Sequence, residues 1–328
     1  MRKICPLWLR RIALVAALPF LAEAALRCYW RFSPISPTFF AIKSDVPGYQ
    51  LAPGSHGRYW HSDRLITVTI DPSGRRIVTG ASSAGIPIHV VGDSQVFGWG
   101  LSDGETICSQ LQSRLGARFL VINHGVPGLG PYGYIQLLRD VPVNELTLLV
   151  QTEENDLWDA YSADTRMTVR CGYLVPADFW GRNMPGWILN SYTFQSLLDL
   201  KYATLDRQRM TPLGFNPCAK VAAAVLNYRM DQLYDAEKQL RGDRLLLTTI
   251  PWDGDVIPAR MDEFSPRIGK PVRLIAFEDD CGMVAAFERA ANPGSLFQPR
   301  DAHLTPAGAA LAADVLAPFV LQKSRGSS

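Results

Sequence analysis

The sequence predicts an α/β protein with a doubly wound, mostly parallel, five-stranded sheet. Apolar runs of the kind that buried parallel strands show recur at residues 88–91, 119–122 and 146–150, and segments of helical periodicity separate them. Each run ends abruptly in a loop rich in glycine or polar residues. A βαβαβ order of this kind favours a parallel sheet with helices on both faces.

The other expected elements follow in chain order. A helix is predicted over residues 104–115, with Ser102 or Asp103 as its cap, and another over 132–139. Proline and glycine interrupt the periodicity over 159–218, which we interpret as an insertion that caps one edge of the sheet. The later elements are a long helix over 221–240, strands over 244–250 and 272–277, a short helix near 284–290 and a final amphipathic helix over 309–321 with Pro306 in its first turn.

The amino terminus has the features of an export signal. Four cations precede an apolar stretch over residues 12–26 and two follow it, which predicts a cytoplasmic amino terminus. The stretch is short for a spanning helix, and Ala22-Glu23-Ala24 within it resembles a cleavage site. An aromatic belt over residues 29–32 favours an uncleaved anchor instead. We therefore expect residues 1–32 to be a signal anchor in the inner membrane, single-pass, with the body in the periplasm or extracytoplasmic space, or secreted if the signal is cleaved.

Residues 33–85 are predicted to form a small β-rich extension ahead of the main domain. Alternation over 65–70 predicts a strand and Asp71-Pro-Ser-Gly74 a turn, while His56 and His61 lie at no spacing that completes a metal site. The main domain then spans 86–322, and a tail covers 323–328.

Composition and cysteine spacing exclude some classes of function. A formal net charge of +2, with no long basic run after the amino terminus, argues against a nucleic-acid-binding protein. No cysteine pair has the spacing of metal ligands. In an oxidising compartment Cys171 and Cys218 are the candidate disulfide, whereas Cys108 lies on an apolar helical face and is expected to be a buried thiol.

A candidate nucleophile follows the first predicted strand. The turn Gly92-Asp93-Ser94 would hold the Ser94 hydroxyl at the carboxyl edge of the sheet, where open α/β sheets bind ligands. Gly98 and Gly100 let the backbone after this turn pass close to its neighbours. We interpret Asp93 as a structural carboxylate of the turn, not a catalytic acid.

Four further residues supply what a serine nucleophile needs. His303, just before the final helix, is the candidate base, and Asp301 would orient it so that Nε2 faces Ser94. The N–H groups of Ser94 and Gly128 and the side-chain amide of Asn155 would hold an oxyanion.

Other polar residues near these loops are given structural roles. Asp156 is expected to cap the turn that follows it, and His89 and His124 to be packed or surface histidines. Gly125 is the alternative to Gly128 as an oxyanion donor, because both lie in the same loop.

In order along the chain, these blocks resemble those of the SGNH/GDSL hydrolase family. The family's first block reads Gly-Asp-Ser, its second supplies a glycine amide, its third reads Gly-x-Asn-Asp, and its last is an Asp–His pair. Glu153 stands where the third block has glycine, and the last pair is Asp-x-His, a spacing that the family also shows. The resemblance covers residues 86–321 and implies a flavodoxin-like, three-layer α/β/α domain and a serine mechanism without metal or cofactor.

The resemblance and the export signal together predict an exported serine esterase or O-acyltransferase. Its expected partners are a small acyl (acetyl) ester or an acylated carbohydrate, and the membrane through the N-terminal segment. One alternative is a lipase-like esterase for longer acyl chains, lined by aromatic residues of the 159–218 insertion. The other is a non-catalytic carbohydrate-binding protein that retains the fold. The sequence does not decide between hydrolase and transferase, and it indicates no oligomeric state.

Overall fold

The computed structural model describes a set of segments that includes most of the predicted domain. These are residues 7–29, 39–42, 49–61, 64–152, 156, 167–170, 172–176, 183–189, 191, 193–194, 197, 235–251, 279–298 and 303–325. The predicted strand over 272–277, most of the helix predicted over 221–240, and the proposed Cys171–Cys218 pair lie outside the described residues.

A four-stranded parallel sheet lies at the centre of the described chain. Its spatial order is β10-β7-β5-β6, which numbers 4-3-1-2 in chain order and is the order of a flavodoxin-like doubly wound sheet. The strands are β5 (Ile86–Gly92), β6 (Phe119–Gly125), β7 (Leu146–Thr152) and β10 (Leu245–Ile250). The predicted parallel α/β fold is confirmed for these four strands.

Burial explains why these four runs become strands. Every residue of β7 and β10 is buried, so a continuous apolar run suits a strand that is covered on both faces. Side chains on one face, such as Val90 and Leu148, join one core cluster, and those on the other, such as Val91 and Leu149, join a second. The sheet therefore separates two apolar cores.

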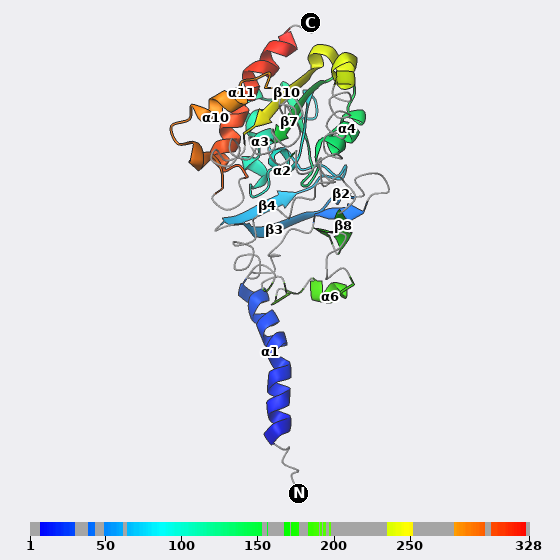
Figure 1. Cartoon of the computed structure of the whole chain (residues 1–328), viewed down its shortest axis with the longest axis vertical. Coiled ribbons are helices and arrows are strands. Elements are labelled where there is room, and N and C mark those ends of the chain that lie inside the picture. The colour runs from blue at the N-terminus through cyan, green and yellow to red at the C-terminus, as the bar shows by residue number, and fades with distance from the viewer. Residues whose placement is uncertain are drawn as a thin grey trace, which may run out of the picture.

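Helices cover both faces of this sheet, with α10 and α11 on one side and α4 on the other in Figure 1. The helices are α3 (Ile107–Leu115), α4 (Pro131–Arg139), α10 (Met283–Glu288) and α11 (Pro306–Arg325), with short turns η3 (Gly242–Arg244) and η4 (Pro293–Leu296). The final helix is longer than the predicted 309–321 at both ends, and it begins at Pro306, a position where proline loses no helical hydrogen bond.

The helix expected over 104–115 begins later than predicted. Asp103–Glu105 form a short 3₁₀ turn, η1, and α3 begins at Ile107 because Thr106 has extended backbone and accepts a hydrogen bond from Ser109 N at 3.2 Å. Ser102 caps η1 and not α3, and its N–H donates to Glu105 Oε2 at 2.9 Å. The two adjacent caps divide one predicted helix into two elements.

The β-rich extension packs on the same core as the sheet. Tyr59 and Val68 from the extension are buried in one cluster with Val91 and Phe97. Its strands, together with a hairpin from the predicted insertion, form three antiparallel pairs: β1 (Phe40–Ile42) with β2 (Tyr49–Leu51), β3 (His56–His61) with β4 (Arg64–Thr69), and β8 (Met167–Arg170) with β9 (Tyr173–Pro176). The expected turn after β4 is present, with Gly74 N donating to Asp71 O at 3.0 Å.

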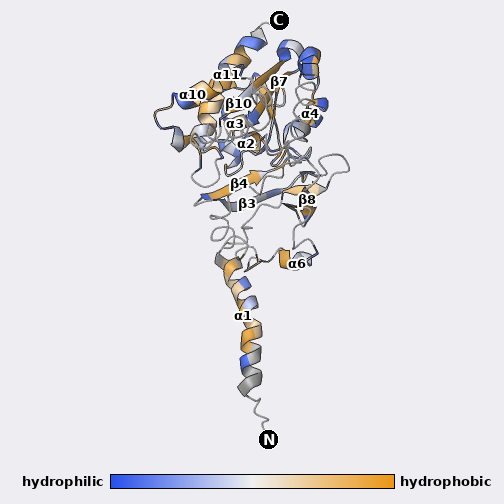
Figure 2. Cartoon of the chain, in the orientation of Figure 1, coloured by the Kyte–Doolittle hydropathy of each residue, from blue (hydrophilic) through white to orange (hydrophobic). Residues whose placement is uncertain are grey.

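Helix α1 (Leu7–Tyr29) projects away from the rest of the described chain (Figure 1). Figure 2 shows apolar residues along much of its length, and large side chains such as Leu14 and Phe20 are exposed. Glu23 Oε2 accepts hydrogen bonds from Ser191 Oγ at 2.7 Å and Thr193 N at 2.9 Å, just after α6 (Gly186–Leu189). Among the described helices, none combines the length and the apolar character needed to cross a membrane.

Cys108 is fully buried, as predicted, and burial raises the pKa of its thiol above its usual range. Cys281 is also buried, and burial raises its thiol pKa to about 12. Both are therefore inert apolar residues at neutral pH.

Candidate active site

Ser94 lies at the carboxyl end of β5 as the first residue of the short helix α2 (Ser94–Phe97). Asp93 Oδ1 accepts hydrogen bonds from Gln95 N at 2.8 Å and Thr152 Oγ1 at 3.2 Å, and the residue is fully buried. The carboxylate thus caps α2 and joins it to the end of β7. The structural role predicted for Asp93 is confirmed.

The structure brings Ser94 and His303 together from positions 209 residues apart in the chain. His303 Nε2 lies 2.8 Å from Ser94 Oγ, which is hydrogen-bond distance. Both residues are half-buried, so the pair is partly shielded and still accessible. A histidine at this distance can accept the hydroxyl proton as the serine attacks a carbonyl carbon.

The turn that carries His303 is fixed by two glutamines. Gln95, the neighbour of Ser94, accepts a hydrogen bond from Leu304 N at its Oε1 (3.1 Å). Gln298 donates its backbone N–H to His303 O at 2.6 Å, and its Nε2 donates to Leu304 O at 3.0 Å. The indole of Trp99 lies beside the imidazole, with 6.2 Å between the ring centroids. The base is therefore anchored directly to the element that carries the nucleophile.

The backbone N–H groups of Ser94 and Gly128, both near this edge, have no acceptor among the described residues. Gly128 lies in the loop after β6, the strand next to β5, and has a positive φ of 76°, which favours glycine. Gly125 N donates to Asn123 Oδ1 at 2.8 Å, so that amide is already engaged. The geometry therefore favours Gly128 over Gly125 as an oxyanion donor.

Two members of the predicted constellation, Asn155 and Asp301, lie outside the described residues. Their roles stay predictions. Among the described residues, no group of three or more His, Cys, Asp or Glu side chains is arranged to hold a metal ion.

Asp156 makes contacts that the sequence did not predict, and the turn that it was expected to cap lies outside the described residues. Asp156 Oδ1 accepts from Tyr134 Oη at 2.6 Å and its Oδ2 from Thr152 N at 3.0 Å. The carboxylate is fully buried. It therefore accepts hydrogen bonds from the end of β7 and from α4, as buried polar groups do.

His89, which is buried, and His124, which is half-buried, form a polar chain with Glu145 on the face of the sheet that also carries Val91. His89 Nδ1 lies 2.9 Å from His124 Nε2, and His89 Nε2 contacts Glu145 Oε2. A carboxylate can only accept, so neutral His89 carries its proton on Nε2, and its bare Nδ1 accepts from His124 Nε2–H. Burial lowers the pKa of both histidines, that of His124 to about 3.

We expect this pair to make the free energy of unfolding fall as the pH drops below about 6.5, the ordinary histidine pKa. Below that pH the unfolded chain binds protons that the folded chain excludes. The contribution of the two neutral histidines to the free energy of unfolding is therefore fully present above pH 6.5 and decreases toward pH 3. The slope approaches about 1.4 kcal/mol per pH unit for each such histidine. Urea denaturation at a series of pH values measures it.

His124→Gln should flatten that pH dependence, since the amide keeps an N–H toward His89 and does not titrate. His56→Gln is the matched control, because His56 is exposed. Equal slopes in the wild type and both variants would contradict the assignment of the effect to the His89–His124 pair.

Comparison with known proteins gives only distant similarities. No protein-family model and no curated protein matches the chain. A lipase/acylhydrolase from Enterococcus faecalis aligns over 73% of this chain and 96% of its own, with 13% identity and a TM-score of 0.38. TesA aligns over 72% and 99%, with 17% identity and a TM-score of 0.37. A lipolytic G-D-S-L protein from Veillonella parvula aligns over 72% and 96%, with 11% identity and a TM-score of 0.33.

A 2-1-3-4 parallel sheet with a serine at the end of its first strand, hydrogen-bonded to a late histidine, has the features of an SGNH/GDSL-type serine hydrolase. This is the family that the sequence blocks resemble.

Proposed function

We propose that the chain is an exported serine esterase or O-acyltransferase that acts on small acyl esters, with acetylated carbohydrate as the substrate class. The observation that carries the proposal is the 2.8 Å contact between Ser94 Oγ and His303 Nε2 at the carboxyl edge of the sheet. The N–H groups of Ser94 and Gly128, which have no acceptor in the described part of the chain, support it, since an acyl-transfer site needs donors for an oxyanion. The choice of acetyl and carbohydrate rests on the family resemblance and the export signal.

The proposed reaction has two acyl transfers. Ser94 Oγ attacks the ester carbonyl as its proton moves to His303 Nε2, and the C–O bond to the alcohol breaks as His303 returns that proton to the leaving oxygen. Water or a sugar hydroxyl then attacks the acyl-serine, again with His303 as base, and Ser94 is released. Asp301 would orient the imidazole and stabilise its charged form, and Asn155 would donate to the oxyanion with the two backbone amides.

We propose that the N-terminal segment, residues 1–32, attaches the chain to the membrane and stays uncleaved, although α1 alone does not have the length and apolar character to cross it. The proposed cleavage site, Ala22-Glu23-Ala24, lies within the continuous helix, and Glu23 is hydrogen-bonded to Ser191 and Thr193. Exposed apolar side chains on α1 support contact with lipid. The body of the chain would then lie outside the cytoplasm.

One experiment tests activity and location together. Membranes from cells that express the full chain are washed with carbonate and incubated with chromogenic acetyl and decanoyl esters, with and without an oligosaccharide acceptor. We expect the protein to stay in the washed membranes and to cleave the acetyl ester faster. Acylated oligosaccharide identifies a transferase, and acetate alone a hydrolase.

Other outcomes would overturn parts of the proposal. Faster cleavage of the decanoyl ester supports the lipase-like alternative, and a folded protein without turnover supports a non-catalytic binding protein. Recovery of a soluble chain that begins at Ala25 would show that the signal is cleaved.

A further inference from the structure

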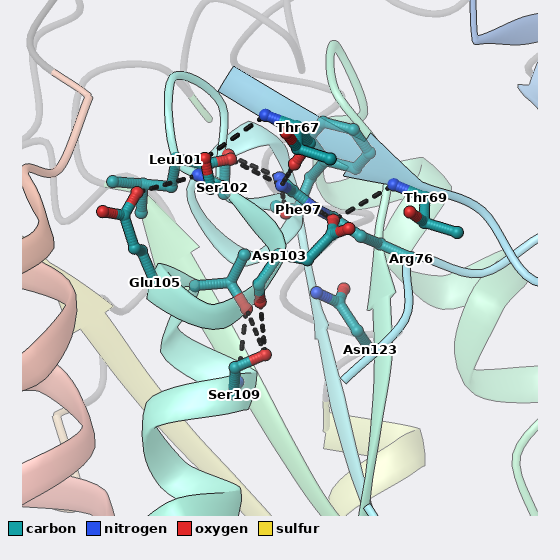
Figure 3. Close-up of polar contacts among 12 residues, drawn as sticks. Thr67, Thr69, Arg76, Phe97, Leu101, Ser102, Asp103, Glu105, Ser109 and Asn123 are labelled. Carbon is teal, nitrogen blue, oxygen red and sulfur yellow. Dashed lines mark hydrogen bonds and ion pairs between the residues drawn. The ribbon is translucent and has the colours of Figure 1, made fainter. Parts of the chain in front are cut away.

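A single arginine from the extension holds the turn that follows the nucleophile helix. Arg76 is 1% exposed, and its side chain points into the loop after α2 (Figure 3). Guanidinium has five N–H donors, and five contacts use them. Nη1 donates to Phe97 O at 2.9 Å and Gly98 O at 2.6 Å, Nη2 to Leu101 O and to Thr67 O at 3.3 Å, and Nε to Asp103 Oδ1 at 3.3 Å.

Three of these five acceptors belong to residues 97–101, which connect α2 to η1. The Arg76 guanidinium also lies over the Phe97 ring, 4.8 Å from its centroid. Gly98 ends α2 with a positive φ of 84°, and a Cβ there would lie 2.5 Å from Thr106 Cγ2. The turn is therefore tightly packed, and its carbonyls point at one buried cation.

A second residue of the extension holds the same turn. Tyr59 Oη accepts a hydrogen bond from Gly100 N at 3.0 Å, and the Tyr59 ring lies 5.9 Å from that of Trp99. Trp99 in turn lies beside the His303 imidazole. Gln298 Nε2, from the His303 turn, donates to Trp99 O at 3.3 Å. The extension thus reaches both members of the nucleophile–base pair through residues 97–101.

Burial makes this arrangement specific for arginine. Desolvation lowers the pKa of Arg76, and the nearby Asp103 carboxylate opposes that shift. Lysine has three N–H donors on one atom and cannot reach carbonyls spread along the turn. Losing the guanidinium leaves buried carbonyls unsatisfied, so the turn is expected to move in order to solvate them.

We propose that Arg76 is a positioning residue for the Ser94–His303 pair, and that the β-rich extension acts in catalysis by bracing residues 97–101. This rests on the proposed ester chemistry. The extension would then be part of the catalytic unit, and its contribution would appear in the rate of the chemical step more than in substrate binding.

The kinetic test compares three variants of the full chain on a chromogenic acetyl ester, at temperatures where circular dichroism shows them folded. We expect Arg76→Lys to lower kcat about 10- to 100-fold with KM changed less than about threefold, because a small misplacement of reacting groups costs rates of this order. Tyr59→Phe should lower kcat about threefold or more. Arg64→Lys is the matched control, since Arg64 pairs with Glu105 of η1 at the surface and touches no carbonyl of the turn.

A second readout does not depend on turnover. Ser94→Ala removes the hydrogen bond to His303 and should shift the ¹⁵N resonance of His303 Nε2. That resonance is identified by its absence from the spectrum of the His303→Gln variant. We expect the shift caused by Ser94→Ala to shrink in the Arg76→Lys and Tyr59→Phe backgrounds, and to keep its size in the Arg64→Lys background.

The outcomes separate the two proposals. If Arg76→Lys and Tyr59→Phe both have the wild-type kcat and an undiminished resonance shift, Arg76 is not a positioning residue. The proposed esterase activity is not affected by that result. If Arg76→Lys does not fold, Tyr59→Phe decides by the same two measurements. A wild-type chain without turnover overturns the ester chemistry, and the resonance shifts then decide whether Arg76 positions the pair.

Discussion

Ser94→Ala should abolish turnover of an acetyl ester, to below about one thousandth of the wild-type kcat, while the chain stays folded. The substitution removes one oxygen atom and leaves the caps of α2 in place, because these come from Asp93 and Gly98. Without Oγ the imidazole of His303 has no nucleophile to activate. Steady-state kinetics and labelling by a fluorophosphonate measure the loss.

Ser295→Ala is the matched control for that variant. Ser295 lies in η4, which contacts the His303 turn because Thr305 Oγ1 donates a hydrogen bond to Ser295 O. The hydroxyl of Ser295 is exposed. The kcat of this variant should stay within about twofold of the wild type. Wild-type turnover in Ser94→Ala would show that another residue is the nucleophile.

The sequence predicted the parts of the fold that come from local patterns. Strands β5, β6 and β7 follow from apolar runs, and the turn at Ser94 from an abrupt change to Gly-Asp-Ser. The break of the 104–115 helix was missed because Thr106 is compatible with a helix, and only its extended backbone makes it a cap.

The contacts that support the site depend on long-range pairing, which no local pattern reveals. His89 and His124 meet because β5 and β6 pair in parallel with Val91 opposite His124, and 35 residues separate the two histidines in the chain. Gln95 lies between Ser94 and Val96, and Gln298 between Phe297 and Pro299, so neither has a spacing that signals a role. The position of Gln95 directly after the candidate nucleophile was the available signal.

The role of Arg76 is the clearest example of a contact that local sequence patterns do not predict. Arg76 follows the turn at Asp71–Gly74 and sits next to Arg75, so in the sequence it has the character of a surface cation. Only the docking of β4 against η1 surrounds its side chain with carbonyls. The role of the β-rich extension therefore depended on tertiary structure.

Asp301→Asn should lower kcat about 10³- to 10⁴-fold with little change in stability, because an amide keeps the size of the carboxylate but allows His303 the wrong tautomer and does not stabilise its charged form. Kinetics on an acetyl ester, with urea denaturation alongside, measures both effects. Asp314→Asn is the matched control: this carboxylate is on α11, 63% exposed, and pairs with Arg114 at the surface, so its loss should leave kcat within about twofold. Asp301→Asn with kcat within about threefold of the wild type would mean that Asp301 does not orient His303, and a different group would have to hold the imidazole in place.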